Sequence, residues 1–167
     1  MSTLFTGDKE LRKVMRKAAT NIKKATSKGL SKAARPIIQK AKANVRPQSV
    51  TVAKSLGLKR KRYAAGAVQS AIIGPRVGSY ATTKQVTNPI TGNKTTKKHE
   101  PWHTAHLIEG GTAPHTIHLK DRNLVIQHPG TKPKPFLEPA FESSKIESVK
   151  IYADTYRVEL AKLKAKV

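Results

Sequence analysis

The sequence predicts an α+β fold with a long N-terminal helix, a small and mainly antiparallel sheet with a protruding loop, and a C-terminal helix. Two long segments near the ends of the chain repeat apolar residues at steps of three and four, which is the period of an amphipathic helix. Between them, short apolar runs alternate with glycine, proline and asparagine, as in strands joined by turns. For a chain of 167 residues we expect one domain over residues 1–167.

The first helix is predicted over residues 8–45, with Asp8 placed to cap its free N–H groups. Gly29 and Pro36 leave open whether this segment is one helix or two consecutive ones. Arg46-Pro47 predicts where it ends. One side is apolar and the other is rich in lysine and arginine; the apolar positions are Leu11, Val14, Met15, Ala18, Ile22 and Ala25.

The middle of the chain, residues 64–128, is predicted to form the sheet. Residues 67–74 indicate a strand, which Gly74-Pro75 ends. Residues 76–100 are polar and rich in threonine, and we expect them to form a long exposed hairpin or a disordered loop. The apolar residues 102–109 and 124–126 are interpreted as further strands.

Residues 129–138 are too rich in proline for a helix or a central strand, and they predict a stiff arm leading into a C-terminal helix over residues 139–164. Phe136, Leu137 and Phe141 supply apolar anchors that either pack in the chain's own core or dock on a neighbour. Own-core packing is favoured for Phe136 and Phe141, because large apolar side chains are usually buried within their own chain. Truncating either to alanine is expected to cost about 3–5 kcal/mol of folding or ring stability.

Charge is the strongest compositional signal, with 33 lysines and arginines against 10 acids and a net charge of +23. Residues 1–62 hold 18 of these cations and only two acids, so most of the excess lies there. Such a concentration favours a polyanion as a partner, most simply DNA, over a merely solvated face or an acidic protein. The cations we expect to face it are Lys13, Lys17, Lys24, Arg60 and Arg62.

Several classes of protein are disfavoured. The chain has no cysteine, no apolar run long enough to span a membrane and no apolar segment of a secretory signal near its start, so we expect it in the cytosol or in a particle assembled there. His103/His106 and His115/His118 have spacings that suit zinc, but few carboxylates lie nearby. No nucleophile motif, phosphate-binding loop or base-reading module is found. We therefore expect no catalysis, no metal and no cofactor.

Two blocks carry a resemblance to a known family: residues 105–112 (AHLIEGGT) and residues 128–141 (HPGTKPKPFLEPAF). Together they resemble the signature of the small tail-completion proteins of long-tailed bacteriophages, in which a segment like AHLVEFGT precedes one like PFLRPA and a C-terminal helix. The sequence departs from that pattern at Gly110 and Glu138, where an aromatic residue and an arginine are usual, and at residues 48–55, which lack a family turn.

The resemblance implies a non-enzymatic virion protein, assembled in the host cytoplasm, that forms a homo-oligomeric ring at the neck. The ring would join tail to head around the DNA path and contact the head–tail connector or stopper and the tail terminator or tail tube. A terminator ring that caps the tail tube and a non-specific nucleic-acid-binding protein remain the alternatives. The expected interface residues are His106, Glu109, Thr112, Pro133, Pro135, Phe136, Leu137 and Phe141.

Overall fold

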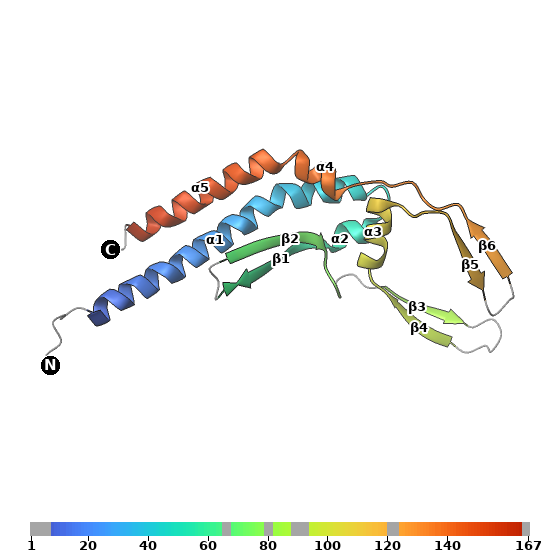
Figure 1. The fold of residues 1–167 in the computed structure, drawn as a ribbon, viewed down its shortest axis with the longest axis horizontal. Helices are drawn as coiled ribbons and strands as arrows, with labels where there is room; N and C mark the ends of the chain where they lie inside the picture. Colours follow the sequence, from blue (N-terminus) through green and yellow to red (C-terminus); the bar gives the residue numbers. More distant parts are fainter. Residues whose placement is uncertain (1–7, 65–67, 79–81, 88–93, 120–123, 165–167) are drawn as a thin grey trace. The chain divides into compact units, whose positions relative to one another are not determined.

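A computed structural model describes residues 8–64, 68–78, 82–87, 94–119 and 124–164 and confirms the α+β class. The first and last described elements are long helices, and shorter helices and strands lie between them in sequence (Figure 1). The helices are α1 (Asp8–Val45), α2 (Val50–Ser55), α3 (Trp102–Gly110), α4 (Leu137–Glu142) and α5 (Lys145–Lys164). The strands are β1 (Leu56–Tyr63), β2 (Val68–Pro75), β3 (Thr82–Thr87), β4 (Lys94–His99), β5 (His115–Leu119) and β6 (Leu124–His128).

The N-terminal segment is a single helix, α1, with Pro36 inside it. Its predicted end is confirmed, because Val45 is its last residue and its carbonyl accepts the N–H groups of Gln48 and Ser49. The side chain of Ser49 then caps α2 by accepting the N–H of Val52 at 3.2 Å. Helix α2 and strand β1 were not expected from the sequence.

In the described residues the strands pair two by two instead of joining in one sheet. Strands β3 and β4 are antiparallel, from Thr82 opposite His99 to Thr87 opposite Lys94, so the hairpin expected within residues 76–100 is confirmed. Residues 79–81 and 88–93 of that segment lie outside the described residues. The strands predicted over 67–74 and 124–126 correspond to β2 and β6, whereas β5 was not expected.

The prediction of a strand over residues 102–109 is wrong, because these residues form α3. Proline has its φ angle preset for the start of a helix, and the carbonyl of Pro101 accepts the N–H of Ala105 at 3.0 Å. Gly111 follows the helix with φ 69° and ψ −171°, a backbone conformation essentially restricted to glycine, so the chain leaves the helix there. A short apolar run does not distinguish strand from helix, and here the flanking proline and glycine decide.

The C-terminal segment holds two helices instead of the one predicted over 139–164. Helix α4 ends at Glu142 and α5 begins at Lys145. Between them, the N–H groups of Ser143 and Ser144 donate to the carbonyls of Pro139 and Phe141.

The chain divides into two compact units, each assembled from separate stretches of sequence. Unit 1 comprises residues 1–36, 59–72 and 145–167, and unit 2 comprises residues 37–58 and 73–144. The core of unit 2 centres on Phe136, whose side chain is 1% exposed, and includes Ala41, Val45, Val52, Ala53, Leu56, Ala105 and Ala140.

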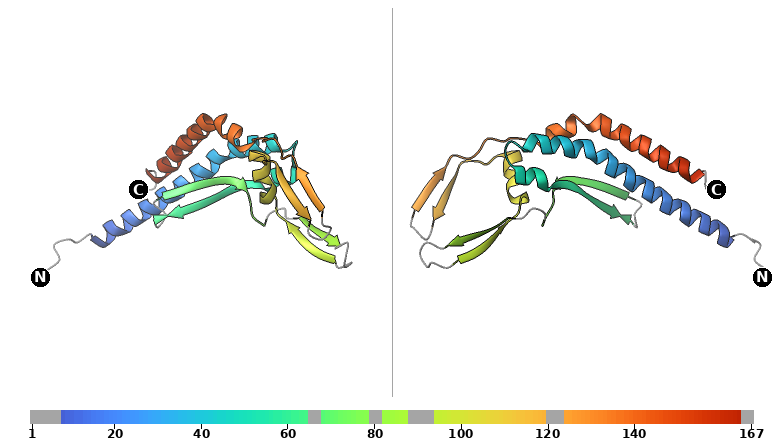
Figure 2. Two further views of the ribbon diagram at one scale, coloured as in Figure 1. Left: turned by 45° about the vertical axis from the view of Figure 1, so that its right-hand side comes forward. Right: turned by 180° about the vertical axis from the view of Figure 1, so that it is seen from behind.

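In unit 1, α5 runs alongside α1 in the opposite direction (Figures 1 and 2). The contact between them relies on small residues: a Cβ atom on Gly29 would lie 2.9 Å from the ring of Tyr152. Gly29, a possible helix breaker in the sequence, is therefore a packing position. The buried residues of this pair are small and partly polar, namely Ala25, Ser27, Gly29, Ala34, Ser148 and Thr155.

Candidate functional site

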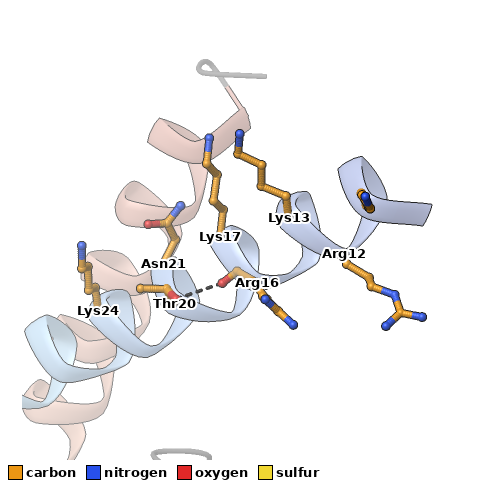
Figure 3. A pocket seen from close by; sticks show the side chains of 8 residues that line it. Arg12, Lys13, Arg16, Lys17, Thr20, Asn21 and Lys24 are labelled. Carbon is orange, nitrogen blue, oxygen red and sulfur yellow. Dashed lines mark hydrogen bonds between the residues drawn. The ribbon is translucent and has the colours of Figure 1, made fainter. Parts of the chain in front are cut away.

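A basic stripe runs along the first turns of α1 in unit 1. Side chains at three- and four-residue steps share one face of a helix. Figure 3 shows Lys13, Lys17 and Lys24 extending from one side of that face and Arg12 and Arg16 from the other. They border an open depression of about 760 Å³, lined by Lys9, Arg12, Lys13, Arg16, Lys17, Thr20, Asn21 and Lys24.

The opposite side of the same turns is apolar and exposed. Leu11, Val14 and Met15 are all more than half exposed, at 58, 57 and 63%. The amphipathic pattern predicted from the sequence is therefore present, but its apolar side has no core beneath it at these turns.

A second basic feature is a groove between α1 and the β1–β2 hairpin, and every residue that lines it belongs to unit 1. Arg60 of β1 donates from Nη1 to the hydroxyls of Ser27 and Ser31, at 2.6 and 3.3 Å. Gln69 of β2 donates to the carbonyl of Lys23 at 2.9 Å. These bonds fasten the hairpin to the helix and leave a groove of about 710 Å³. Its lining consists of Thr20, Lys23, Lys24, Ser27, Lys28, Ser31, Arg60, Arg62 and Gln69.

The five cations predicted to face a polyanion all lie in unit 1. Lys24, Arg60 and Arg62 line the groove, and Lys13 and Lys17 lie on the stripe. Thr20 and Lys24 border both features, so the stripe and the groove are continuous. Sequence reasoning missed the hydroxyl and amide groups of the groove. The only signal was that residues 20, 27 and 31 share a helix face with the cations.

One groove cation is paired with a carboxylate. Lys28 Nζ lies 2.6 Å from Glu159 of α5, and Lys162 donates to the same carboxylate oxygen at 3.1 Å. The hydrogen bond from Lys28, followed by that from Lys162, lowers the pKa of Glu159 below its ordinary value. Glu159 therefore remains charged to lower pH and ties α5 to α1.

Unit 2 contains the two sequence blocks that carry the family resemblance, and a carboxylate joins them. Glu109, at the end of α3, accepts the backbone N–H groups of Phe136, Leu137 and Glu138 at 2.7 to 3.2 Å. Lys134 N–H donates to the carbonyl of Ile108 at 2.8 Å. We call this contact, between residues 108–112 and 131–138, the arm clasp.

Two glycine–threonine pairs complete the arm clasp. Thr112 and Thr131 exchange both backbone hydrogen bonds at 3.0 Å, and their hydroxyls also lie 3.0 Å apart. The neighbouring Gly111 and Gly130 have φ angles of 69° and 80°. A Cβ atom on either one would collide with the carbonyl of the threonine opposite. Close backbone approach therefore requires glycine at both places.

The predicted interface residues occupy different environments. Phe136 is buried and Leu137 packs against the same core, so the own-core expectation is confirmed for Phe136. For Phe141 that expectation is wrong, because its side chain is 51% exposed. Glu109 and Thr112 bond within the arm clasp, while Pro133, Pro135 and His106 are exposed.

The histidines show one pairing that the sequence did not indicate. His115 and His128 face each other across β5 and β6, with ring centroids 4.9 Å apart. The backbone N–H of Gly130 donates to Nδ1 of His128 at 3.0 Å. Within the described ranges, no three histidine, cysteine or acidic residues are grouped in a way that could hold a metal ion.

No helix among the described residues is both long and apolar enough to cross a membrane. Comparisons of the chain with protein families, with curated proteins and with solved structures find no match.

Proposed function

We propose that this chain is a structural virion protein, a ring subunit of the phage neck or tail-completion apparatus that joins tail to head around the DNA path. The observation that carries the proposal is the arm clasp. The two blocks that resemble the tail-completion signature are separated by residues 113–127, yet Glu109 and Thr112 of the first bind Phe136 and Thr131 of the second. The resembling residues thus form one structural feature, as expected of a family signature.

The chemistry of the arm clasp suits a supporting role. The Glu109 carboxylate accepts backbone N–H groups, and the threonine hydroxyls bond to each other. The Glu109 hydrogen bonds are charge-assisted and therefore strong, and they hold a proline-stiffened segment at a defined place. An arm held in this way can present Phe141, which follows it and is exposed, to a neighbouring subunit.

Helix α5 supplies a second surface for a neighbouring copy. Ile146 and Val149 are 80 and 68% exposed, whereas Ser148 and Thr155 are buried. The hydroxyl of Ser148 has no hydrogen-bond partner. This arrangement, with serine buried and isoleucine and valine exposed, favours association over an isolated chain. Covering exposed apolar surface lowers the free energy of the protein. If each copy covers this surface of the next in a head-to-tail manner, the copies form a closed ring when the rotation between neighbours permits it.

The test is assembly of the purified full chain, measured by light scattering after size exclusion and by negative-stain imaging, alone and with tails. Wild type is expected to form rings. Ile146→Gln combined with Val149→Gln should give monomers with unchanged circular dichroism. Glu147→Gln combined with Lys150→Gln, on the same turns, is the matched control and should assemble.

A wild-type chain that stays monomeric both alone and with tails contradicts the proposal. If rings form, addition to separated heads and tails distinguishes the neck from the terminator. A neck subunit restores joining, whereas a terminator sets tail length. The other candidate, a non-specific nucleic-acid-binding protein, is favoured by the basic groove and predicts DNA binding by a monomer.

A further inference from the structure

We infer that the groove between α1 and the β1–β2 hairpin binds the phosphate backbone of duplex DNA without reading the bases. The groove belongs to a single chain, so the inference goes beyond the proposed function and does not depend on ring formation. Among the described residues that line it, none is acidic, and five are lysine or arginine. Lys28 is paired with Glu159, so the inference rests on Lys24, Arg60 and Arg62, which line the same groove.

The groove has the donors that phosphate requires. Arg60 uses Nη1 for Ser27 and Ser31, and those two bonds orient the rest of its guanidinium. Arg62 lines the same groove. Guanidinium groups match phosphate oxygens in a bidentate manner.

The length of the basic surface suits a duplex. Because the stripe and the groove share Thr20 and Lys24, the cationic face continues from Lys9 to Ser31. At 1.5 Å per residue it extends about 33 Å along α1. One helical turn of duplex DNA is of similar length, roughly 34–36 Å. Several phosphates can therefore be contacted at once.

Other partners fit the groove less well. Its described lining residues include no aromatic side chain on which the bases of a single strand could stack. The same residues include no large apolar side chain, whereas binding energy at protein interfaces is concentrated in buried anchors. A phosphate backbone needs neither, since its affinity comes from charge and counterion release.

The experiment measures binding of the full chain to two fluorescent duplexes of unrelated sequence and to one strand of each alone, by anisotropy between about 50 and 200 mM salt. Equal affinity for both duplexes is expected, with log affinity falling linearly with log salt. Arg60→Gln combined with Arg62→Gln should weaken binding about tenfold or more at low salt and reduce the slope by about 2. Lys24→Gln combined with Arg62→Gln should do the same while leaving the bonds of Arg60 in place.

The matched control is Lys59→Gln combined with Lys61→Gln. These exposed residues lie on the same strand but alternate with Arg60 and Arg62, and they are absent from the groove lining. The two control substitutions remove the same charge as Arg60→Gln combined with Arg62→Gln, but they should change the affinity for DNA much less. Equal weakening by the control pair, a preference for one duplex or for single strands, or no binding at low salt would each overturn the inference. Ring assembly is measured separately, so failure here leaves the proposed function standing.

Discussion

At the scale of single residues, Phe136 and Phe141 differ sharply despite lying in one short segment. Phe136 is 1% exposed in the core of unit 2, and Phe141 is 51% exposed. The sequence presents both as apolar anchors within two residues of a proline. What separates them is the arm clasp, since Glu109 accepts the N–H of Phe136 at 2.7 Å. That partner lies 27 positions earlier in the chain, so no local pattern reveals it.

The first prediction at this scale compares the two phenylalanines. Phe136→Ala should destabilise the fold by about 3–5 kcal/mol, because it leaves a cavity in a packed core. Phe141→Ala should leave fold stability within about 1 kcal/mol of wild type, because the ring is half exposed. Urea denaturation followed by circular dichroism measures both. Equal losses of stability would show that Phe141 is buried in solution and that the assignment is wrong.

The basic surface shows which features the residue spacing predicts and which it does not. Helical spacing placed Lys13, Lys17 and Lys24 on one face, and the structure has them there. The pattern did not show that Arg60 and Arg62, from a strand that was not expected, would lie across a groove from Lys24. That juxtaposition depends on hydrogen bonds between Arg60 and two serines distant in sequence.

At the scale of elements, long periodic segments were predicted well and short ones were not. Helix α1 begins at the expected Asp8 and ends at the expected Val45. The apolar run that forms α3 was interpreted as a strand, because nine residues hold too few turns to show a period. Helix α5 was predicted from its apolar positions, but the sequence did not predict which side faces α1, where Ser148 and Thr155 are buried.

The pairing of α5 with α1 should depend on pH. The hydrogen bonds from Lys28 and Lys162 lower the pKa of Glu159 in the folded chain. A depressed pKa stabilises the fold above the unfolded pKa, and that stabilisation is lost as pH falls through the folded value. We therefore expect the melting temperature of wild type to decrease once the pH drops below about 4. At neutral pH, Glu159→Gln should have a lower melting temperature than wild type.

The control for Glu159 is Glu147→Gln, on the same helix, whose side chain is exposed. It removes only an interaction with the helix dipole and should lower the neutral-pH melting temperature less than Glu159→Gln does. The difference between wild type and Glu159→Gln should shrink as the medium becomes acidic. A difference that stays constant with pH means that Glu159 contributes through packing and not through its charge.

At the scale of the whole molecule, net charge and exposed apolar surface have opposite effects on association between copies of the chain. A chain of net charge +23 repels its own copies, whereas exposed residues such as Ile146 and Val149 favour association. Salt screens the repulsion between chains but leaves apolar contacts in place. DNA bound along the basic surface of unit 1 would also neutralise part of the excess.

Assembly and DNA binding should therefore respond to salt in opposite directions. In sedimentation velocity, raising salt from about 50 to 200 mM should shift the purified chain toward larger species, because screening weakens repulsion. Over the same range, affinity for duplex DNA should fall steeply, because counterion release drives that binding. At low salt, added duplex should promote assembly of wild type, and Arg60→Gln combined with Arg62→Gln should reduce this effect of DNA. Assembly that instead weakens with salt would mean that ion pairs hold the copies together, and the contribution assigned to Ile146 and Val149 would be wrong.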